Sequence, residues 1–247
     1  MNSAYHRRVV LPNELGNSTS RQLHSTSSAL IVPVGSTEQH GPHLPLDTDT
    51  RIATAVAGAT AGLLTDTGGT DWLLAPAIAY GASGEHEGFS GTISIGTAAL
   101  QAVLIEFGRS AMNWASRLVF VNGHGGNTEA LRAATALLRR EGRDASWCPC
   151  IVKDSDPHAG HTETSVLLYI SPSDVNLDER RRGNTAPLNE LMPQMRRGGV
   201  AAVSELGVLG DPTTATAAEG ARIFSEMVHG CADRITRWMP GPDGMLR

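Results

Sequence analysis

The sequence predicts an α/β protein: a three-layer α/β/α sandwich around a mostly parallel central sheet. Four short apolar runs have the length of strands and are apolar on both faces, as in a parallel sheet that helices cover on both sides. Longer segments with helical spacing of apolar residues lie between these runs, the alternation expected of βαβ units. Clusters of His, Asp and Glu follow directly after the runs, where such sheets bind ligands.

The predicted strands cover residues 28–35, 71–81, 116–123 and 145–152. The predicted helices cover residues 49–64, 98–114, 127–142, 162–170 and 211–239. Asp49 and Asn127 stand where N-caps are expected, and Gly142 stands where the third helix should end. No repeat or low-complexity linker interrupts the chain. We therefore expect one domain over residues 1–247, with an N-terminal extension over 1–27 and an irregular segment over 171–199.

The composition is that of a folded globular chain. Of its 247 residues, 40% are hydrophobic and 18% are charged, which excludes the class of disordered proteins with few aliphatics and high net charge. A net charge of −5 gives no reason to expect nucleic acid or an anionic membrane as a partner. No apolar run approaches the roughly 20 residues that span a bilayer, and the first residues lack the apolar core of a signal peptide. The three cysteines are an odd number unsuited to a disulfide framework, so we expect a cytoplasmic protein.

Four polar segments carry the side chains that could bind a metal or take part in catalysis, one after each predicted strand. They are "GSTEQHGPHLPLDTDT" (35–50), "YGASGEHEGFSGT" (80–92), "NGHGGN" (122–127) and "DPHAGHTETS" (156–165). In an open parallel sheet these segments share the C-terminal edge of the strands. The sequence therefore predicts one site built from four separate loops.

The residue types in these loops suit a metal centre. Glu38 and His40 form E-x-H in an extended segment, so their side chains point the same way. With Asp49, His124 and Glu163 they make three carboxylates and two imidazoles, ligands suited to zinc, iron or manganese. This set exceeds what one tetrahedral ion takes and suits two ions about 3.5–4 Å apart that share a carboxylate. We predict one or two divalent ions per subunit.

Each ligand also has a plainer interpretation. Asp49 and Glu163 suit helix N-termini, where acids are stabilising, and His124 is compatible with an ordinary hydrogen-bonded loop histidine. Other catalytic patterns fit less well, because "GASGE" lacks the last glycine of a nucleophile elbow, "GHGGN" is followed by no G-K-[ST], and H-E-x-x-H is absent. If there were no metal site, the plainer interpretations would all have to hold independently for residues at the same sheet edge. A metal site explains these residues together and is therefore favoured.

Three further residues are candidates for the substrate pocket. Glu85 and His86 lie in the Gly-rich segment after the second predicted strand, where we expect them to shape that pocket. His43 is expected at the same pocket, or behind a metal ligand that it orients. Ordinary surface-loop residues are the alternative interpretation for all three.

The motifs resemble those of the creatininase (creatinine amidohydrolase) family. The resemblance is carried by "PVGSTEQHGPHLPLDTDT", "GEHEGFSGTISI", "VNGHGGN", "HAGHTETS" and "GVLGDPTTATAAEG", and runs over about residues 32–228. It implies a creatininase-like fold and a metal-dependent hydrolase of C–N amide bonds. Transferred to matching positions, it implies the metal ligands Glu38, His40, Asp49 as the bridging residue, His124 and Glu163, and a catalytic histidine at His158, with His161 as its rival.

Gly126 departs from the family pattern. Creatininase itself carries a ligating Glu two residues after the histidine of the N-G-H motif, and here that position is a glycine. The departure implies a weaker second metal position or a single ion. It also argues against creatinine as the substrate.

Three other segments, "MNSAYHRRV", "GRDASWCPC" and "RWMPGPDGM", resemble the mycofactocin-system branch of the family most closely. This likeness implies a peptidase that acts on a modified precursor peptide during cofactor biosynthesis. Such an enzyme hydrolyses the amide before a decarboxylated, crosslinked C-terminal Val-Tyr pair and releases a small core. The family also implies a homo-oligomer, with a hexamer favoured. The alternatives are a small-molecule amidohydrolase or deformylase of the same family, and a non-catalytic chaperone that binds the precursor.

Overall fold

A computed structural model describes residues 14–24, 27–66 and 70–247. Most of the predicted N-terminal extension, residues 1–13 and 25–26, lies outside the described residues. The described part contains a four-stranded parallel sheet in the order β2-β1-β3-β4. Its strands are β1 Ser28–Val34, β2 Asp71–Leu74, β3 Arg117–Asn122 and β4 Ala145–Pro149.

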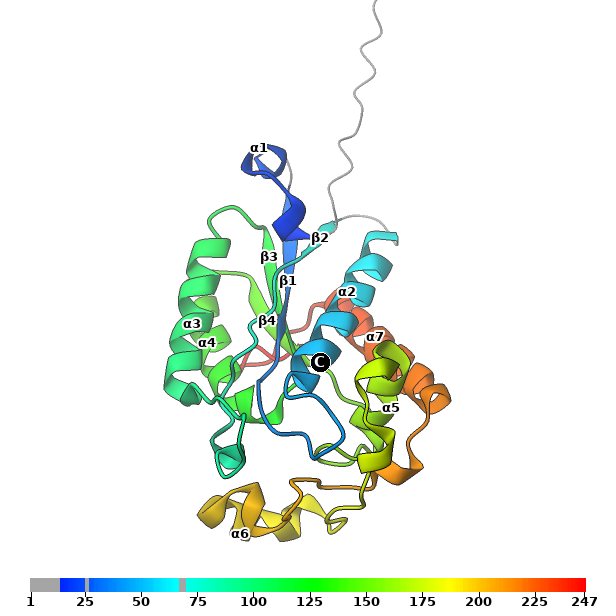
Figure 1. The fold of residues 1–247 in the computed structure, drawn as a ribbon. Helices are drawn as coiled ribbons and strands as arrows, with labels where there is room; N and C mark the ends of the chain where they lie inside the picture. Colours follow the sequence, from blue (N-terminus) through cyan, green and yellow to red (C-terminus); the bar gives the residue numbers. More distant parts are fainter. Residues whose placement is uncertain (1–13, 25–26, 67–69) are drawn as a thin grey trace, which may run out of the picture.

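Helices cover both faces of this sheet, which confirms the predicted α/β sandwich (Figure 1). On one face, α3 Gly96–Ala111 packs against α4 Thr128–Arg140. On the other face, α7 Ala217–Arg237 packs against α2 Thr48–Asp66 and α5 His161–Ile170. The strands are buried on both sides, and two hydrophobic cores result, one under each helical layer. This double burial explains why the strands are apolar runs rather than alternating ones.

The second strand is shorter than predicted. The expected strand covers 71–81, but β2 ends at Leu74; the Ala75 N–H still donates to the Ile31 carbonyl at 2.9 Å, and the regular alternation of donors to β1 then stops. The chain then returns to β1, where the Ile78 N–H donates to the Pro33 carbonyl at 2.9 Å. The segment therefore still runs beside β1 to the end of the sheet, and the loop that follows reaches the same edge.

The segment expected to be irregular contains a helix. Residues 171–199 include α6, Leu188–Gly198, after two short 3-10 turns. Leu188, Leu191, Met192 and Met195 have the i, i+3, i+4, i+7 spacing of an amphipathic helix, and Leu191 is buried against Val200 and Leu209. This helix was not predicted because the Arg- and Gly-rich flanks and Pro193 obscured this spacing.

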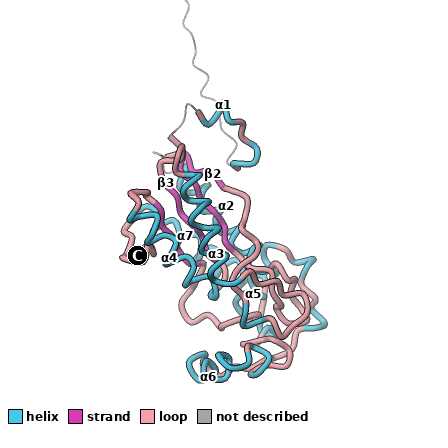
Figure 2. The backbone as a smooth tube through the Cα atoms, turned by 90° about the vertical axis from the view of Figure 1, so that its left-hand side faces the viewer, coloured by secondary structure: helices cyan, strands magenta, loops and turns pink. Residues whose placement is uncertain are grey.

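The molecule has two distinct ends in both views. The short helix α1, Ser20–Leu23, lies at one end, and α6 lies at the other, beyond the C-terminal ends of the strands (Figures 1 and 2). The loops that follow β1, β2 and β3 therefore open toward α6. Among the described residues, no helix combines the length and apolarity required to cross a membrane.

Candidate metal centre

Asn127 ties together the loops that follow three strands. Its side chain is fully buried, and its Oδ1 accepts the Ala82 N–H at 2.9 Å. Its Nδ2 donates to the Gly35 carbonyl at 2.9 Å and to Asn122 Oδ1 at 3.2 Å. Asn127 is the residue before α4, as predicted, but its side chain makes no capping hydrogen bond. It instead fixes the ends of the three segments that carry the candidate ligands.

Asp49 lies between two imidazoles in the first turn of α2. Its Oδ1 is 3.1 Å from His40 Nε2, and its Oδ2 is 3.2 Å from His124 Nδ1. His40 Nδ1 lies 3.1 Å from the Glu38 carbonyl oxygen, to which it donates, so Nε2 is the nitrogen free to ligate. Asp49 therefore connects both histidines rather than capping its helix.

Glu38 is completely buried, yet its carboxylate accepts no hydrogen bond. Neither Oε1 nor Oε2 has a hydrogen-bond partner, and the same holds for Oδ2 of Asp49. Ring nitrogens of His86 and His124 lie 3.2 Å from the two Glu38 oxygens, but not in hydrogen-bonding orientation. Buried carboxylate oxygens without donors are costly, whereas carboxylates and imidazoles whose lone pairs converge suit a shared cation.

Glu163 approaches the same group from α5. Its Oε2 lies 3.9 Å from His40 Nε2 and also accepts the Ala159 N–H at 2.6 Å. The plainer interpretation, in which Glu163 serves the start of its helix, is therefore partly right. The carboxylate of Asp156 accepts the N–H groups of His161 and Thr162 and so caps α5. Because Asp156 caps α5 and Oε2 of Glu163 bonds to Ala159, the other oxygen of Glu163, Oε1, is left for another partner.

Within residues 14–24, 27–66 and 70–247, three groups of side chains place their ligand atoms within 4.8 Å of one another. Two of them, Glu38–Asp49–His124 and His40–Asp49–Glu163, share Asp49. The third is Glu38–His40–His158. All five ligands predicted from the sequence are thus brought together. The donor set and the unpartnered buried oxygens fit divalent cations, with Asp49 common to two positions.

The charges of these side chains are strongly coupled. Burial alone would lower the pKa of His40, but the carboxylates of Asp49, Glu163 and Glu38 together outweigh burial and raise the pKa to about 10. Burial likewise opposes protonation of His124, whereas Glu38 and Asp49 raise its pKa to about 10. Burial raises the pKa of Glu38 to about 7 and that of Glu163 to about 7. Without a cation, protons bound to these side chains therefore compensate the negative charge of the carboxylates.

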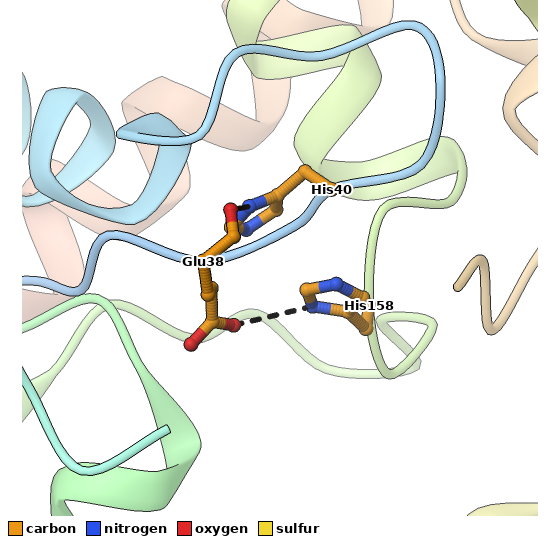
Figure 3. A group of neighbouring side chains, drawn as sticks. All are labelled: Glu38, His40 and His158. Carbon is orange, nitrogen blue, oxygen red and sulfur yellow. Dashed lines mark hydrogen bonds and ion pairs between the residues drawn. The ribbon is translucent and has the colours of Figure 1, made fainter. Parts of the chain in front are cut away.

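Gln39 organises two further histidines. Its Oε1 accepts the Gly41 N–H at 2.9 Å, so its Nε2 is the donor to the Gly207 carbonyl at 3.1 Å and to His86 Nδ1 at 2.8 Å. His158 Nε2 lies 2.8 Å from the Gln39 carbonyl oxygen, to which it donates. His158 Nδ1 thereby carries the lone pair and faces Glu38 Oε1 at 3.7 Å (Figure 3). Burial and the charge of His40 hold the pKa of His158 well below its usual range, so its imidazole is neutral.

The rival histidine lies elsewhere. His161 Nδ1 is 2.8 Å from Thr214 Oγ1, and His161 lines a neighbouring surface hollow with Thr214 and Asp211 rather than the cavity at the candidate ligands. His43 does not line the candidate site's cavity either. Its Nε2 lies 2.9 Å from Thr164 Oγ1, beside Glu163, which fits support of that ligand's helix better than contact with a substrate.

A cavity of about 590 Å³ opens onto the group of candidate ligands. Its polar lining includes Asp49, Glu85, His86, His124, His158 and Glu163. Its apolar lining includes Ile151, Leu188, Met192, Met195, Val200 and Met227, several of them on α6. Both Glu85 and His86 thus lie where the sequence analysis expected a pocket. Gln39 and Asn127 were missed, although each lies within one of the quoted motifs.

Comparison with known proteins agrees with this geometry. A family model described as creatininase, creatinine amidohydrolase, matches residues 14–235. The chain belongs to the creatininase family. A mutant creatininase described as "Zn-Zn type" superposes with a TM-score of 0.78 at 26% identity, over 94% of this chain and 100% of that chain. The creatininase-like fold and the resemblance seen in the motifs are therefore confirmed.

Two curated members of the family match over the whole chain. A protein of Mycolicibacterium smegmatis named mycofactocin precursor peptide peptidase is 71% identical over 246 residues, covering 100% of both chains. A protein of the same name from Mycobacterium tuberculosis is 67% identical over 250 residues, again covering 100% of both. Within the creatininase family, this chain is thus similar to peptidases of one named precursor.

Proposed function

We propose that this chain is a metal-dependent peptidase that cleaves the modified Val-Tyr-derived core from the C-terminus of the mycofactocin precursor peptide. The observation that carries the proposal is the group of five candidate ligands, three of which line a 590 Å³ cavity, in a chain 71% identical to a protein of that name. The cleaved bond is the amide before the crosslinked pair.

Glu38, His40, Asp49, His124 and Glu163 would hold one or two divalent ions of the zinc, iron or manganese type. When bound, such an ion polarises an amide carbonyl and promotes its hydrolysis by water. Because Asp49 belongs to two of the three groups, Glu38–Asp49–His124 and His40–Asp49–Glu163, its loss should weaken ion binding at both of these positions.

We infer that His158 moves the proton that amide hydrolysis requires. Its Nε2 is engaged with the Gln39 carbonyl, so Nδ1 is the basic atom and points toward Glu38 at the site. A neutral imidazole accepts a proton as water attacks and returns it to the departing amine, which is a poor leaving group as an anion. His161 is bonded to Thr214 outside the cavity and has no such position.

The apolar part of the cavity suits the substrate's core. Leu188, Met192 and Met195 of α6 face this space, together with Ile151 and Met227. Flexible methionine side chains adapt to an aromatic ring, such as that of a tyrosine-derived group. An unmodified peptide lacks the compact crosslinked shape, so the pocket gives a physical basis for selecting the modified form.

The test is cleavage of modified and unmodified precursor by the metal-loaded protein, followed by mass spectrometry. We expect release of the core from the modified peptide alone, and loss of that release after chelation. His158→Ala should remove most of the rate, whereas the matched variant His161→Ala should keep it. Binding of the modified peptide without any released fragment would instead support a chaperone. Hydrolysis of a small amide or formamide alone would support the other amidohydrolase functions of the family.

The homo-oligomer, with six subunits favoured, and the cytoplasmic location belong to the same proposal. Light scattering coupled to size-exclusion chromatography measures the number of subunits directly. The candidate metal ligands all belong to one chain.

A further inference from the structure

Glu85 brings a further carboxylate to His124. It lies on the 3-10 turn Gly84–His86 (η2), and its Oε1 is 3.6 Å from His124 Nε2. The same nitrogen is 3.2 Å from Glu38 Oε2, while Nδ1 of that ring is 3.2 Å from Asp49 Oδ2. His124 is therefore surrounded by three carboxylates, two from the segment after β1 and one from the loop after β2. Within the described part of the chain, the Glu85 carboxylate has no ion-pair partner other than His124.

Gly126 makes room for this carboxylate. A Cβ atom at Gly126 would lie 2.8 Å from Glu85 Oε1 and 2.5 Å from His124 Nε2, and it would also collide with the Ala82 carbonyl. Any side chain at position 126 would thus occupy the space between the Glu85 carboxylate and the imidazole. A residue-126 side chain and Glu85 cannot both approach His124 in this conformation.

A second glycine fixes the backbone from which Glu85 extends. Gly199, at φ +67°, follows α6, and a Cβ there would lie 2.6 Å from the Glu85 carbonyl oxygen. The turn η2 packs against α6 and the following 3-10 turn Val200–Ala202. The backbone of Glu85 is therefore held closely, whereas its side chain, 32% exposed, remains free to turn toward the cavity that it lines.

We propose that Glu85 is a metal ligand that completes the position formed by Glu38, Asp49 and His124, so that the chain binds two divalent cations. The proposal rests on the metal-dependent function proposed above and gives Glu85 a different role from the substrate contact expected from the sequence. Glu38 leaves two buried oxygens without hydrogen bonds at this position, and Glu85 adds the charge and the donor that Gly126 does not supply. The ligand comes from the loop after β2 instead of the loop after β3.

The test is calorimetric titration of the chelator-treated, full-length protein with Zn²⁺, with metal content measured by mass spectrometry. We expect two ions per chain. Glu85→Gln keeps the shape of the side chain but removes its charge, and should weaken one of the two binding events by at least about tenfold. Glu163→Gln should weaken the other event, and the double variant should weaken both. The matched control is Glu87→Gln, an exposed acid on the same turn, which should bind Zn²⁺ as the unaltered chain does.

Each outcome bears on one proposal. Two Zn²⁺ ions bound by Glu85→Gln with unaltered affinity would overturn the assignment, as would a single ion in both proteins. Loss of one ion in Glu85→Gln supports it, whether or not the peptide is cleaved. If the unaltered protein binds two ions but cleaves no modified peptide, the proposed function fails and the ligand assignment stands.

Discussion

Replacement of Gln39 by methionine tests how much this one side-chain amide contributes to the stability and activity of the candidate metal centre. The Gln39 side chain is buried; it accepts a hydrogen bond from the Gly41 N–H and donates to the Gly207 carbonyl and to His86 Nδ1, and its Nε2 also lies 3.0 Å from His158 Nε2. Methionine has nearly the same length and volume, so Gln39→Met removes the hydrogen bonds without leaving a large cavity. The effect should therefore come from polar groups that lose their partners.

The magnitude follows from these three bonds. A buried hydrogen bond contributes about 1 kcal/mol to stability, and a partner left buried and unsatisfied costs somewhat more. Gln39→Met should therefore lower the free energy of unfolding by about 3 kcal/mol. The catalytic rate should also fall, because Gln39 orients His86 against the Glu38 carboxylate, whose Oε1 is 3.2 Å from His86 Nε2.

Urea unfolding of the metal-free proteins, followed by fluorescence and circular dichroism, measures the first effect. Gln194→Met is the matched control, since Gln194 is exposed on α6, and its effect should stay within about 0.5 kcal/mol. A loss of less than about 1 kcal/mol for Gln39→Met, with an unchanged cleavage rate, would refute the claim that this amide organises the site.

Three other predictions concern the metal and the substrate. Asp49→Asn should remove both metal ions in metal analysis and abolish cleavage, because Asp49 belongs to two groups of ligands; full activity would rule out this ligand set. Metal uptake at pH 8 should release protons, since the pKa of His40 is raised to about 10 in the metal-free protein and its proton must leave before Nε2 ligates. Affinity should thus weaken as the pH falls, by about tenfold per pH unit for each proton released, as calorimetry in buffers of different ionisation enthalpy will show. Met192→Ala should raise KM for the modified peptide several-fold with little change in kcat, because Met192 lines the cavity but belongs to none of the groups of candidate ligands; an unchanged KM would exclude contact of α6 with the core.

The sequence predicted the layers of the fold and the convergence of the ligands for one physical reason. Parallel strands buried on both faces are continuous apolar runs, and their C-terminal ends meet at one edge. Once the four runs are recognised, Glu38, Asp49, His124 and Glu163 must lie near that edge. The structure places them there, within two groups that share Asp49.

The supporting residues were not predictable in this way. Gln39 lies between two ligands in the E-x-H motif, but an amide has no distinctive chemistry, and its partners His86 and Gly207 are 47 and 168 residues away. Asn127 has the sequence position of a helix cap, and its actual partners are backbone and amide groups of three loops. Such roles depend on which backbone atoms the fold leaves unpaired, and only the three-dimensional arrangement reveals them.

In the proposed metal centre, Glu85 supplies the carboxylate that the family motif carries at the position of Gly126. A ligand missing from a motif is therefore weak evidence that the ion itself is missing. A metal position depends on how many charged donors reach a point, not on which loop supplies them. The glycine that removes a side chain beside His124 is also what lets a carboxylate from the preceding loop approach. The charge of the cation is then compensated by a carboxylate from a different loop.

The buried carboxylates also link metal binding to the stability of the fold. Both oxygens of Glu38 and Oδ2 of Asp49 lack hydrogen bonds, an arrangement that is costly in a protein interior unless a charge of opposite sign compensates it. A cation that binds the folded chain but not the unfolded chain stabilises it in proportion to its affinity. The loops that Asn127 ties together carry these oxygens, so their order should depend on the metal more than that of the helical layers does.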